Sequence, residues 1–222
     1  MPDERTIKYK HLKFRLQLTG FKHTGLFPEQ AVNWDWMIER IKSSKKQINV
    51  LNLFAYTGGA TIACASAGAK VCHVDASKGM VSWAAKNAEL SNLSDKPIRW
   101  IVDDCMKFLQ REIRRGNKYD AVIMDPPSYG RGPNGEIWKI EDELYNLIEA
   151  SSKVLTNRPL FFLVNSYTTG FSPIVPGNMI VKLIKNTHAG KLNSGEIGLP
   201  ASHDNQLILP CGIFSRWESD YS

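Results

Sequence analysis

The sequence is poor in cysteine, and the few cysteines it has are scattered. Cys64, Cys72, Cys105 and Cys211 form no CxxC pair, and none has the spacing to a histidine that is typical of a zinc site. Neither a disulfide framework nor a bound metal is therefore expected. We predict reduced thiols, most of them buried.

Long apolar runs are absent as well. No stretch approaches the roughly 18 consecutive apolar residues of a membrane-spanning helix, and the opening residues MPDERTIKYKHLK contain no apolar centre of a signal peptide. A cytoplasmic protein is the expectation. The 222 residues, 43% of them hydrophobic, suffice for one substantial core.

Acidic residues are scarce in the first fifth of the chain. Up to Lys46 there are ten basic and five acidic residues, whereas the remainder has 18 and 17. Between Leu12 and Thr19 apolar and polar residues alternate, as in a half-buried strand, so Lys13 and Arg15 share one face. That face could follow the phosphates of a nucleic acid or simply be solvated, and charge alone leaves both interpretations open.

A short amphipathic helix is predicted after this strand. In AVNWDWMIERIKSS the apolar residues Val32, Trp36, Ile38 and Ile41 recur at helical spacing, and the serines mark the end. We therefore assign residues 1–46 to a basic extension of strand, loop and helix. Residues 47–222 form the main domain.

From Ile48 onward, short apolar runs alternate with helical stretches. Such alternation predicts an α/β fold with a mostly parallel sheet and helices on both faces. The last two apolar runs have no helix between them, which predicts a terminal antiparallel hairpin of 195–201 and 206–218. The expected strands are 48–54, 70–75, 98–104, 119–125 and 159–165. The expected helices are 60–69, 78–90, 106–115 and 137–155.

Polar residues and glycines follow the expected strands. In an open α/β sheet ligands bind beyond the carboxyl ends of the strands. Gly58 and Gly59 would let the backbone turn tightly near a ligand, and Asp75 has the spacing of a carboxylate that binds ribose hydroxyls. Asp103 and Asp104 could accept a hydrogen bond from adenine, or could merely cap the next helix. Together these residues predict a nucleoside cofactor.

The segment IMDPPSYG raises a separate question, because a strand cannot continue through it. Pro126 and Pro127 have fixed φ angles and no N–H, and a proline also biases the preceding Asp125 toward an extended conformation. Asp125 and the carbonyls after it are then expected to face the cleft as hydrogen-bond acceptors for an amine or a ring N–H. A purely structural turn is the alternative.

These motifs resemble those of class I S-adenosylmethionine-dependent methyltransferases. VLNLFAYTGGATIACASAGAKVCHVDASKGMVSWAAKNAELSNL is similar to the first two cofactor motifs of that family, VDD to the third and DPPSYGRG to the fourth. The resemblance implies a Rossmann-like seven-stranded fold that binds S-adenosylmethionine. It implies that Asp75 binds the ribose and Asp104 the adenine amine, that Ala76 and Cys105 flank the adenine, and that Asp125 borders the methyl donor. The other cofactor contacts it implies are Phe27, Gln30, Phe54, Tyr56, Thr57, Gly58 and Ser77.

More narrowly, TGLFPEQAVNWDWM and DASKGMVSWAAKNAELSNL resemble the bacterial family of large-subunit ribosomal RNA methyltransferases. The cytosine-5 enzymes of this group carry an RNA-binding PUA domain ahead of this region, where this chain has only about 45 residues. They also carry a catalytic cysteine after the next strand, and this sequence has none between Cys105 and Cys211. Asn165, in NSYTTGF, is instead similar to a segment of the guanine-N7 enzymes, so a nitrogen acceptor is favoured.

Three functions therefore stay open. The first is methylation of a base in ribosomal RNA, with Asp125, Pro126, Pro127 and Asn165 as the catalytic residues. Tyr129 and Arg131 would then contact the substrate together with the basic face of Lys13 and Arg15. The second is methylation of a protein side chain or small molecule, and the third is a non-catalytic scaffold. A nicotinamide dehydrogenase is disfavoured because AYTGGA lacks GxGxxG. Trp34, Trp36 and Trp83 could line the core or an interface, and an oligomer is possible.

Overall fold

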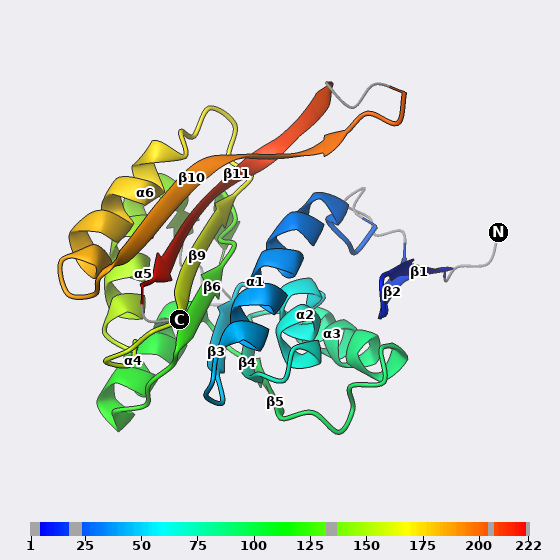
Figure 1. The fold of residues 1–222 in the computed structure, drawn as a ribbon, viewed down its shortest axis with the longest axis horizontal. Coiled ribbons are helices and arrows are strands. Elements are labelled where there is room, and N and C mark those ends of the chain that lie inside the picture. The colour runs from blue at the N-terminus through cyan, green and yellow to red at the C-terminus, as the bar shows by residue number, and fades with distance from the viewer. Residues whose placement is uncertain (1–4, 18–23, 132–136, 204–206, 221–222) are drawn as a thin grey trace.

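Parallel strands form the centre of the computed structural model, which describes residues 5–17, 24–131, 137–203 and 207–220. Within those residues a seven-stranded sheet has the order β10-β11-β9-β6-β3-β4-β5 (Figure 1). Its parallel strands are β3 (Asn49–Leu53), β4 (Lys70–Asp75), β5 (Ile98–Val102), β6 (Ala121–Met124) and β9 (Phe161–Ser166). The predicted class I methyltransferase fold, with its mostly parallel sheet, is confirmed.

An antiparallel hairpin completes one side of the sheet, as the sequence predicts. Strand β11 (Ile208–Ser219) pairs antiparallel with β9, and β10 (Gly190–Pro200) pairs with β11 at the sheet edge. Figure 1 shows the hairpin extending well beyond the parallel strands, over the start of α1.

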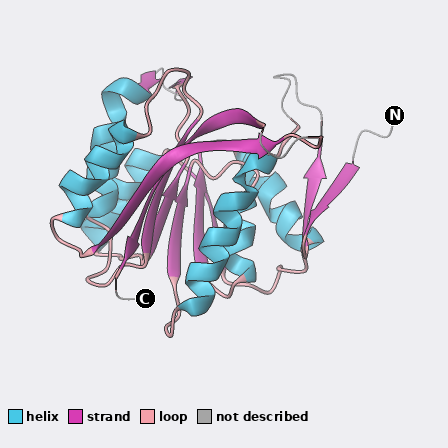
Figure 2. Ribbon diagram, turned by 45° about the horizontal axis from the view of Figure 1, so that its top comes forward, coloured by secondary structure: helices cyan, strands magenta, loops and turns pink. Residues whose placement is uncertain are grey.

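Helices cover both faces of the sheet (Figure 2). The apolar side chains of the central strands alternate between the two faces, so that Leu51 and Leu53 pack on one side and Val50 on the other. One face carries α1 (Ala31–Ser43), α2 (Gly59–Ser66) and α3 (Lys78–Leu90). The other carries α4 (Cys105–Arg115), α5 (Ile140–Ser152), α6 (Ile174–Ile180) and the π-helical turn η2 (Val181–Lys185).

The N-terminal hairpin docks onto helix α3. It consists of β1 (Arg5–Tyr9) and β2 (Leu12–Leu16), and Leu12 and Phe14 share the core of the α1 face. Side chains at the end of α3 hold the free edge of β2, because the Arg15 N–H donates to Asn87 Oδ1 at 2.7 Å and the Lys13 N–H donates to Oγ of Ser91, the residue after the helix, at 2.9 Å. Leu18 and Thr19, which the sequence places in this strand, lie outside the described residues.

The buried face of α1 differs from the prediction. Val32 is 49% exposed, whereas Asn33, Trp34, Met37 and Ile41 are buried. The buried stripe has the i, i+4, i+8 spacing of a helix packed on one side, but it includes a polar asparagine that sequence hydrophobicity does not reveal. Trp34 and Trp83 belong to the interior and Trp36 is half-buried.

One predicted helix begins later than expected. Residues Ile137–Lys139, placed in a helix by the sequence, instead form strand β8, which pairs with β7 (Tyr129–Arg131). The backbone N–H of Ile140, the first helical residue, donates to the Ser128 carbonyl at 3.1 Å. In the described part of the chain no helix is long and apolar enough to cross a bilayer.

Candidate functional site

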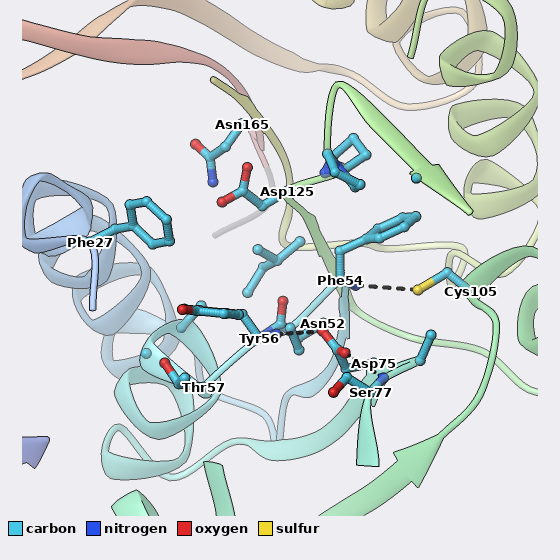
Figure 3. A pocket seen from close by; sticks show the side chains of 18 of the residues that line it. Phe27, Asn52, Phe54, Tyr56, Thr57, Asp75, Ser77, Cys105, Asp125 and Asn165 are labelled. Atoms are coloured by element: carbon cyan, nitrogen blue, oxygen red, sulfur yellow. Dashed lines mark hydrogen bonds between the residues drawn. The ribbon is translucent and has the colours of Figure 1, made fainter. Parts of the chain in front are cut away.

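A cavity of about 1180 Å³ opens where the parallel strands end at their carboxyl edge (Figure 3). Segments that follow β3, β4, β5, β6 and β9 line it, together with the turn η1 (Pro28–Gln30) and the residues before that turn. Of the predicted site residues, those that line it are Phe27, Gln30, Phe54, Tyr56, Thr57, Asp75, Ala76, Ser77, Asp104, Cys105, Asp125, Pro126, Pro127 and Asn165. Gly58 does not line it, and Gly59 does.

The turn after β3 is strained. Phe54 and Tyr56 have φ angles of 52° and 50°, which cost a non-glycine residue about 1–3 kcal/mol, and Gly58 has a φ of 84°. Hydrogen bonds hold this backbone in place, because the Ala55 N–H donates to the Val74 carbonyl at 3.1 Å and the Gly58 N–H donates to the Ala55 carbonyl at 3.0 Å. The turn therefore brings its backbone and the Tyr56 ring to the cavity wall.

Asp75 is a structural centre of the cavity. Its two carboxylate oxygens accept hydrogen bonds from the Tyr56 N–H and the Ser77 N–H, each at 2.8 Å. Burial raises the pKa of Asp75, and the two backbone donors oppose that shift. Each oxygen can accept a further bond, so the carboxylate can receive two donors from a ligand.

The end of β5 combines an exposed apolar residue with a capped helix. Val102 is 50% exposed where it borders the cavity, so an apolar surface is available to a flat ligand. Asp104 is the N-cap of α4 and accepts a hydrogen bond from the Lys107 N–H at 2.8 Å, which confirms the capping interpretation of this residue. Cys105 Sγ accepts from the Phe54 N–H at 3.3 Å, and burial raises the pKa of the Cys105 thiol.

Asp125 follows β6 directly and points into the cavity beside Asn165, the side chain at the end of β9 (Figure 3). The two are neighbours because β6 and β9 are parallel with Met124 opposite Val164. Burial raises the pKa of Asp125 to about 7, and the nearby carboxylate of Glu29 adds to the shift. A carboxyl group with this pKa can hold or release a proton near neutral pH.

The carbonyls after Asp125 are less available than the sequence predicts. The Pro127 carbonyl accepts a hydrogen bond from Trp138 Nε1 at 2.6 Å, and the Ser128 carbonyl accepts from the Ile140 N–H. The Pro127 and Ser128 carbonyls, which the sequence predicts to face the cleft as acceptors, therefore each already accept one hydrogen bond from within the protein. Trp138 instead fastens the loop, and its ring lies 5.4 Å from that of Phe54.

An aromatic wall faces Asp125 from the η1 side. The Phe27 ring lies between those of Tyr56 and Tyr167, with centroid distances of 5.7 and 5.1 Å. The Tyr167 hydroxyl accepts a hydrogen bond from Gln30 Nε2 at 2.8 Å, and burial raises the pKa of this phenol, as do the charges of Asp125 and Glu29. Tyr167 is therefore a neutral hydroxyl at the acidic end of the cavity.

The residues predicted to contact a macromolecular substrate lie apart from the cavity lining. Tyr129 is 50% exposed in β7, Lys13 and Arg15 lie in β2, and the side chain of Arg131 lies outside the described residues. Sequence reasoning missed Val102, Trp138 and Tyr167. Val102 and Tyr167 lie at strand ends and could have been found by the rule that located Asp75, whereas nothing in the sequence distinguishes Trp138.

Comparison with known proteins relates this chain to methyltransferases. A family model described as S-adenosylmethionine-dependent methyltransferase matches residues 3–148. The chain is 33% identical over 156 residues to the ribosomal RNA large subunit methyltransferase K/L of Shewanella frigidimarina, a match that covers 69% of this chain and 21% of that protein. The chain thus spans about a fifth of the length of this curated relative.

Solved structures agree with this assignment. The SAM-dependent methyltransferase of Agrobacterium tumefaciens is 36% identical, with a TM-score of 0.92, and the match covers 98% of this chain and 71% of that one. The protein SMU.776, solved in complex with SAH, has a TM-score of 0.75 at 20% identity, covering 98% of this chain and 56% of that one, and so shows the shared fold.

The close packing of Gly58 gives a first prediction. A Cβ atom at Gly58 would lie 2.8 Å from the Cβ of Ala84, whereas Gly68, which also has a positive φ, has open space around it. Gly68→Ala should therefore lower the free energy of unfolding only by the backbone strain, about 1 kcal/mol. Gly58→Ala should lower it by about 2–4 kcal/mol. Urea denaturation of the two variants measures both values. Equal losses in the two variants would contradict the packing described for the turn.

Proposed function

This chain belongs to the S-adenosylmethionine-dependent methyltransferase family, and we propose that it methylates a nitrogen atom of a base in ribosomal RNA. The observation that carries the proposal is Asp125, a carboxylate with a pKa near 7 that faces the donor cavity directly after a central strand. The ribosomal RNA substrate is supported by the name of the Shewanella relative.

The cavity residues fit S-adenosylmethionine. The two acceptor oxygens of Asp75 suit the ribose hydroxyls, and the exposed Val102 together with Ala76 suits the faces of the adenine. Asp104 would accept from the adenine amine, with Cys105 beside it. We assign the methionine portion to the strained turn, with Phe54, Tyr56 and Thr57 lining the cavity and Gly58 shaping the turn, and assign Ser77 to the ribose side. Phe27 and Gln30 would close over the cofactor.

When bound, the cofactor would supply a methyl group on a sulfonium, where in-line attack by a nitrogen lone pair on the methyl carbon releases the neutral thioether. Asp125 would accept a hydrogen bond from the N–H of the acceptor and orient its lone pair toward that methyl group. When the acceptor nitrogen is methylated, the proton of that N–H would pass to the Asp125 carboxylate. Pro126 and Pro127 would hold the backbone of Asp125 in an extended conformation. Asn165 would contact the same base that receives the methyl group.

Carbon-5 methylation of cytosine is not supported by the thiols of this chain. It requires a cysteine thiolate as nucleophile. Cys64 and Cys105 are buried, with pKa values raised by burial, and Cys72 is buried with its pKa raised to about 11. Cys211 lies in β11 and is not part of the cavity lining.

The outward face of the N-terminal hairpin offers a docking surface for RNA. Lys8 lies directly opposite Lys13 across the two strands, and both side chains are exposed. Like charges in that position destabilise a hairpin, and an anion bound between them would remove that cost. Arg15 lies on the same face, and its guanidinium is 5.9 Å from the centre of the Trp83 ring. We propose that the extension 1–46 uses this face to follow phosphates.

Transfer of labelled methyl groups from S-adenosylmethionine to ribosomal RNA tests the proposal. The RNA would be isolated from a strain that lacks this gene, because RNA from the normal strain would already be modified. Label incorporated by the wild-type protein and lost in Asp125→Ala is the expected result. Label that enters protein or a small molecule, but no RNA, would contradict it.

Two substitutions should separate cofactor binding from catalysis. Asp75→Ala removes charge-assisted hydrogen bonds to the ribose and should weaken S-adenosylmethionine binding about 10- to 100-fold by calorimetry. Asp125→Ala should leave this affinity within about threefold, because its partner is the acceptor, while abolishing single-turnover methyl transfer. Unchanged affinity in Asp75→Ala would contradict the ribose assignment, and normal turnover in Asp125→Ala would contradict the catalytic role.

The pKa of Asp125 predicts the pH dependence of the reaction. Below about pH 7 the carboxyl group is protonated and cannot take the proton of the acceptor, so the single-turnover rate should rise about tenfold per pH unit up to pH 7 and then level off. Asp125→Asn should lack this titration. A wild-type rate that is constant between pH 5 and 8 would rule out Asp125 as the base.

Neutralising the basic hairpin face should weaken RNA binding in a salt-dependent way. Lys8→Gln combined with Lys13→Gln should reduce the slope of log affinity against log salt by about 1.5–2, with S-adenosylmethionine affinity unchanged. The matched control is Lys182→Gln with Lys185→Gln, the same change of charge in η2, near the opposite side of the molecule (Figure 1). Equal changes in slope for the two pairs would show that the hairpin has no particular role.

A further inference from the structure

A buried chain of amides lies behind the acceptor end of the cavity. Arg216 Nε donates to Asn33 Oδ1 at 2.7 Å, and Asn33 Nδ2 in turn donates to Asn165 Oδ1 at 2.9 Å and to Gln30 Oε1 at 2.8 Å. Asn33 is fully buried and Arg216 is buried, and neither lines the cavity. They can therefore affect a ligand only through Asn165 and Gln30.

The direction of every bond in this chain follows from Arg216. A guanidinium has only N–H donors, so the atom of Asn33 that faces it must be the carbonyl oxygen. The amide nitrogen of Asn33 then faces the other two side chains, which must present their oxygens to it. As a result Asn165 turns its own N–H₂ group toward the cavity, and Gln30 donates to the Tyr167 hydroxyl at 2.8 Å.

The guanidinium at the start of the chain is held rigidly. Its carbon lies 4.2 Å from the centroid of the Phe214 ring and 5.2 Å from that of Trp36. Stacking of this kind suits the planar guanidinium and not the ammonium of a lysine. Because Arg216 cannot rotate away without losing these contacts, it gives the amide chain one fixed polarity.

We infer that Arg216 and Asn33 are positioning residues that fix Asn165 as a hydrogen-bond donor beside the acceptor Asp125, and so select the base edge that is methylated. The choice of edge rests on the proposed function, whereas the amide relay does not. Asp125 and Asn165 lie side by side at the end of the cavity (Figure 3). An edge that fits has an N–H donor next to an acceptor.

This pattern distinguishes among the nitrogen atoms of the bases. The Watson–Crick edges of guanine, adenine and cytosine each place an N–H beside an acceptor. The major-groove edge of guanine, by contrast, presents two acceptors, N7 and O6, and would place one of them against the Asp125 carboxylate. The relay therefore favours a nitrogen that carries an N–H, such as the amino nitrogen of adenine or cytosine or N1 of guanine, over guanine N7.

Asn33→Asp is the variant that tests the relay most directly. It keeps the size of the side chain and the acceptor for Arg216, but it replaces the donor that faces Asn165 with a second acceptor. Asn165 must then turn its N–H₂ group inward and present its oxygen beside Asp125. We expect kcat/KM for methyl transfer to RNA to fall about 10- to 100-fold.

A double-mutant cycle with Asn165→Asp tests whether the two residues act through the same N–H group. Asn165→Asp removes the cavity-facing donor directly, so the double variant should be no more than about threefold worse than the worse single variant. Losses that multiply would overturn the relay, as would normal kcat/KM in a folded Asn33→Asp protein. Ser215→Ala is the matched control, because Ser215 is buried next to Arg216 but bonds Ser194 and Pro173, and kcat/KM should stay within about threefold.

A second measurement does not need any substrate. In the wild type the side-chain amide protons of Asn165 face the cavity and should exchange with solvent through it in NMR experiments on the SAH-bound protein. In Asn33→Asp they turn to the buried carboxylate and should exchange at least about tenfold more slowly. Unchanged exchange would overturn the relay. If exchange slows but the wild type methylates no RNA, the relay stands and the proposed substrate fails.

Discussion

Everything in the site depends on the parallel register of five neighbouring strands. Parallel strands end together at one edge of a sheet, so β3, β4, β5, β6 and β9 deliver their next residues to the same place. Asp75, Asp125 and Asn165 are each distant in sequence from the others, and each lies within one residue of the end of its strand. The antiparallel hairpin also contributes to the site, because β11 runs antiparallel to β9 and brings Arg216 behind Asn165.

Several residues of the site lower the stability of the folded protein. Two non-glycine residues, Phe54 and Tyr56, hold positive φ angles, and Asp125 is desolvated near Glu29. Neither arrangement would be selected for folding alone, since each raises the free energy of the native state. The compensation lies in hydrogen bonds around these residues, such as those of Asp75 to the turn and of Trp138 to Pro127. A rigid wall and a carboxyl group that titrates near neutral pH are the result.

Much of this could be predicted from the sequence, and the rest could not for identifiable reasons. The strand-to-helix alternation gave the sheet, and the rule that ligands bind at strand ends located Asp75 and Asp125. The buried side of α1 was misassigned because Asn33 is polar and still fully buried, which only its bonds to Arg216 and Asn165 explain. Trp138 was missed because its role depends on one hydrogen bond to the Pro127 carbonyl across a loop, and the local sequence contains no pattern that predicts such a bond.

The central claim is that Asp125 and Asn165 present an acceptor and a donor to the base edge that receives the methyl group. Mass spectrometry of the nucleosides from methylated ribosomal RNA tests it most directly, because fragmentation locates the methyl group on one atom. We predict a single base methylated on a nitrogen that carries an N–H, such as the amino nitrogen of adenine or cytosine or N1 of guanine. A methyl group on carbon or on guanine N7 would contradict it.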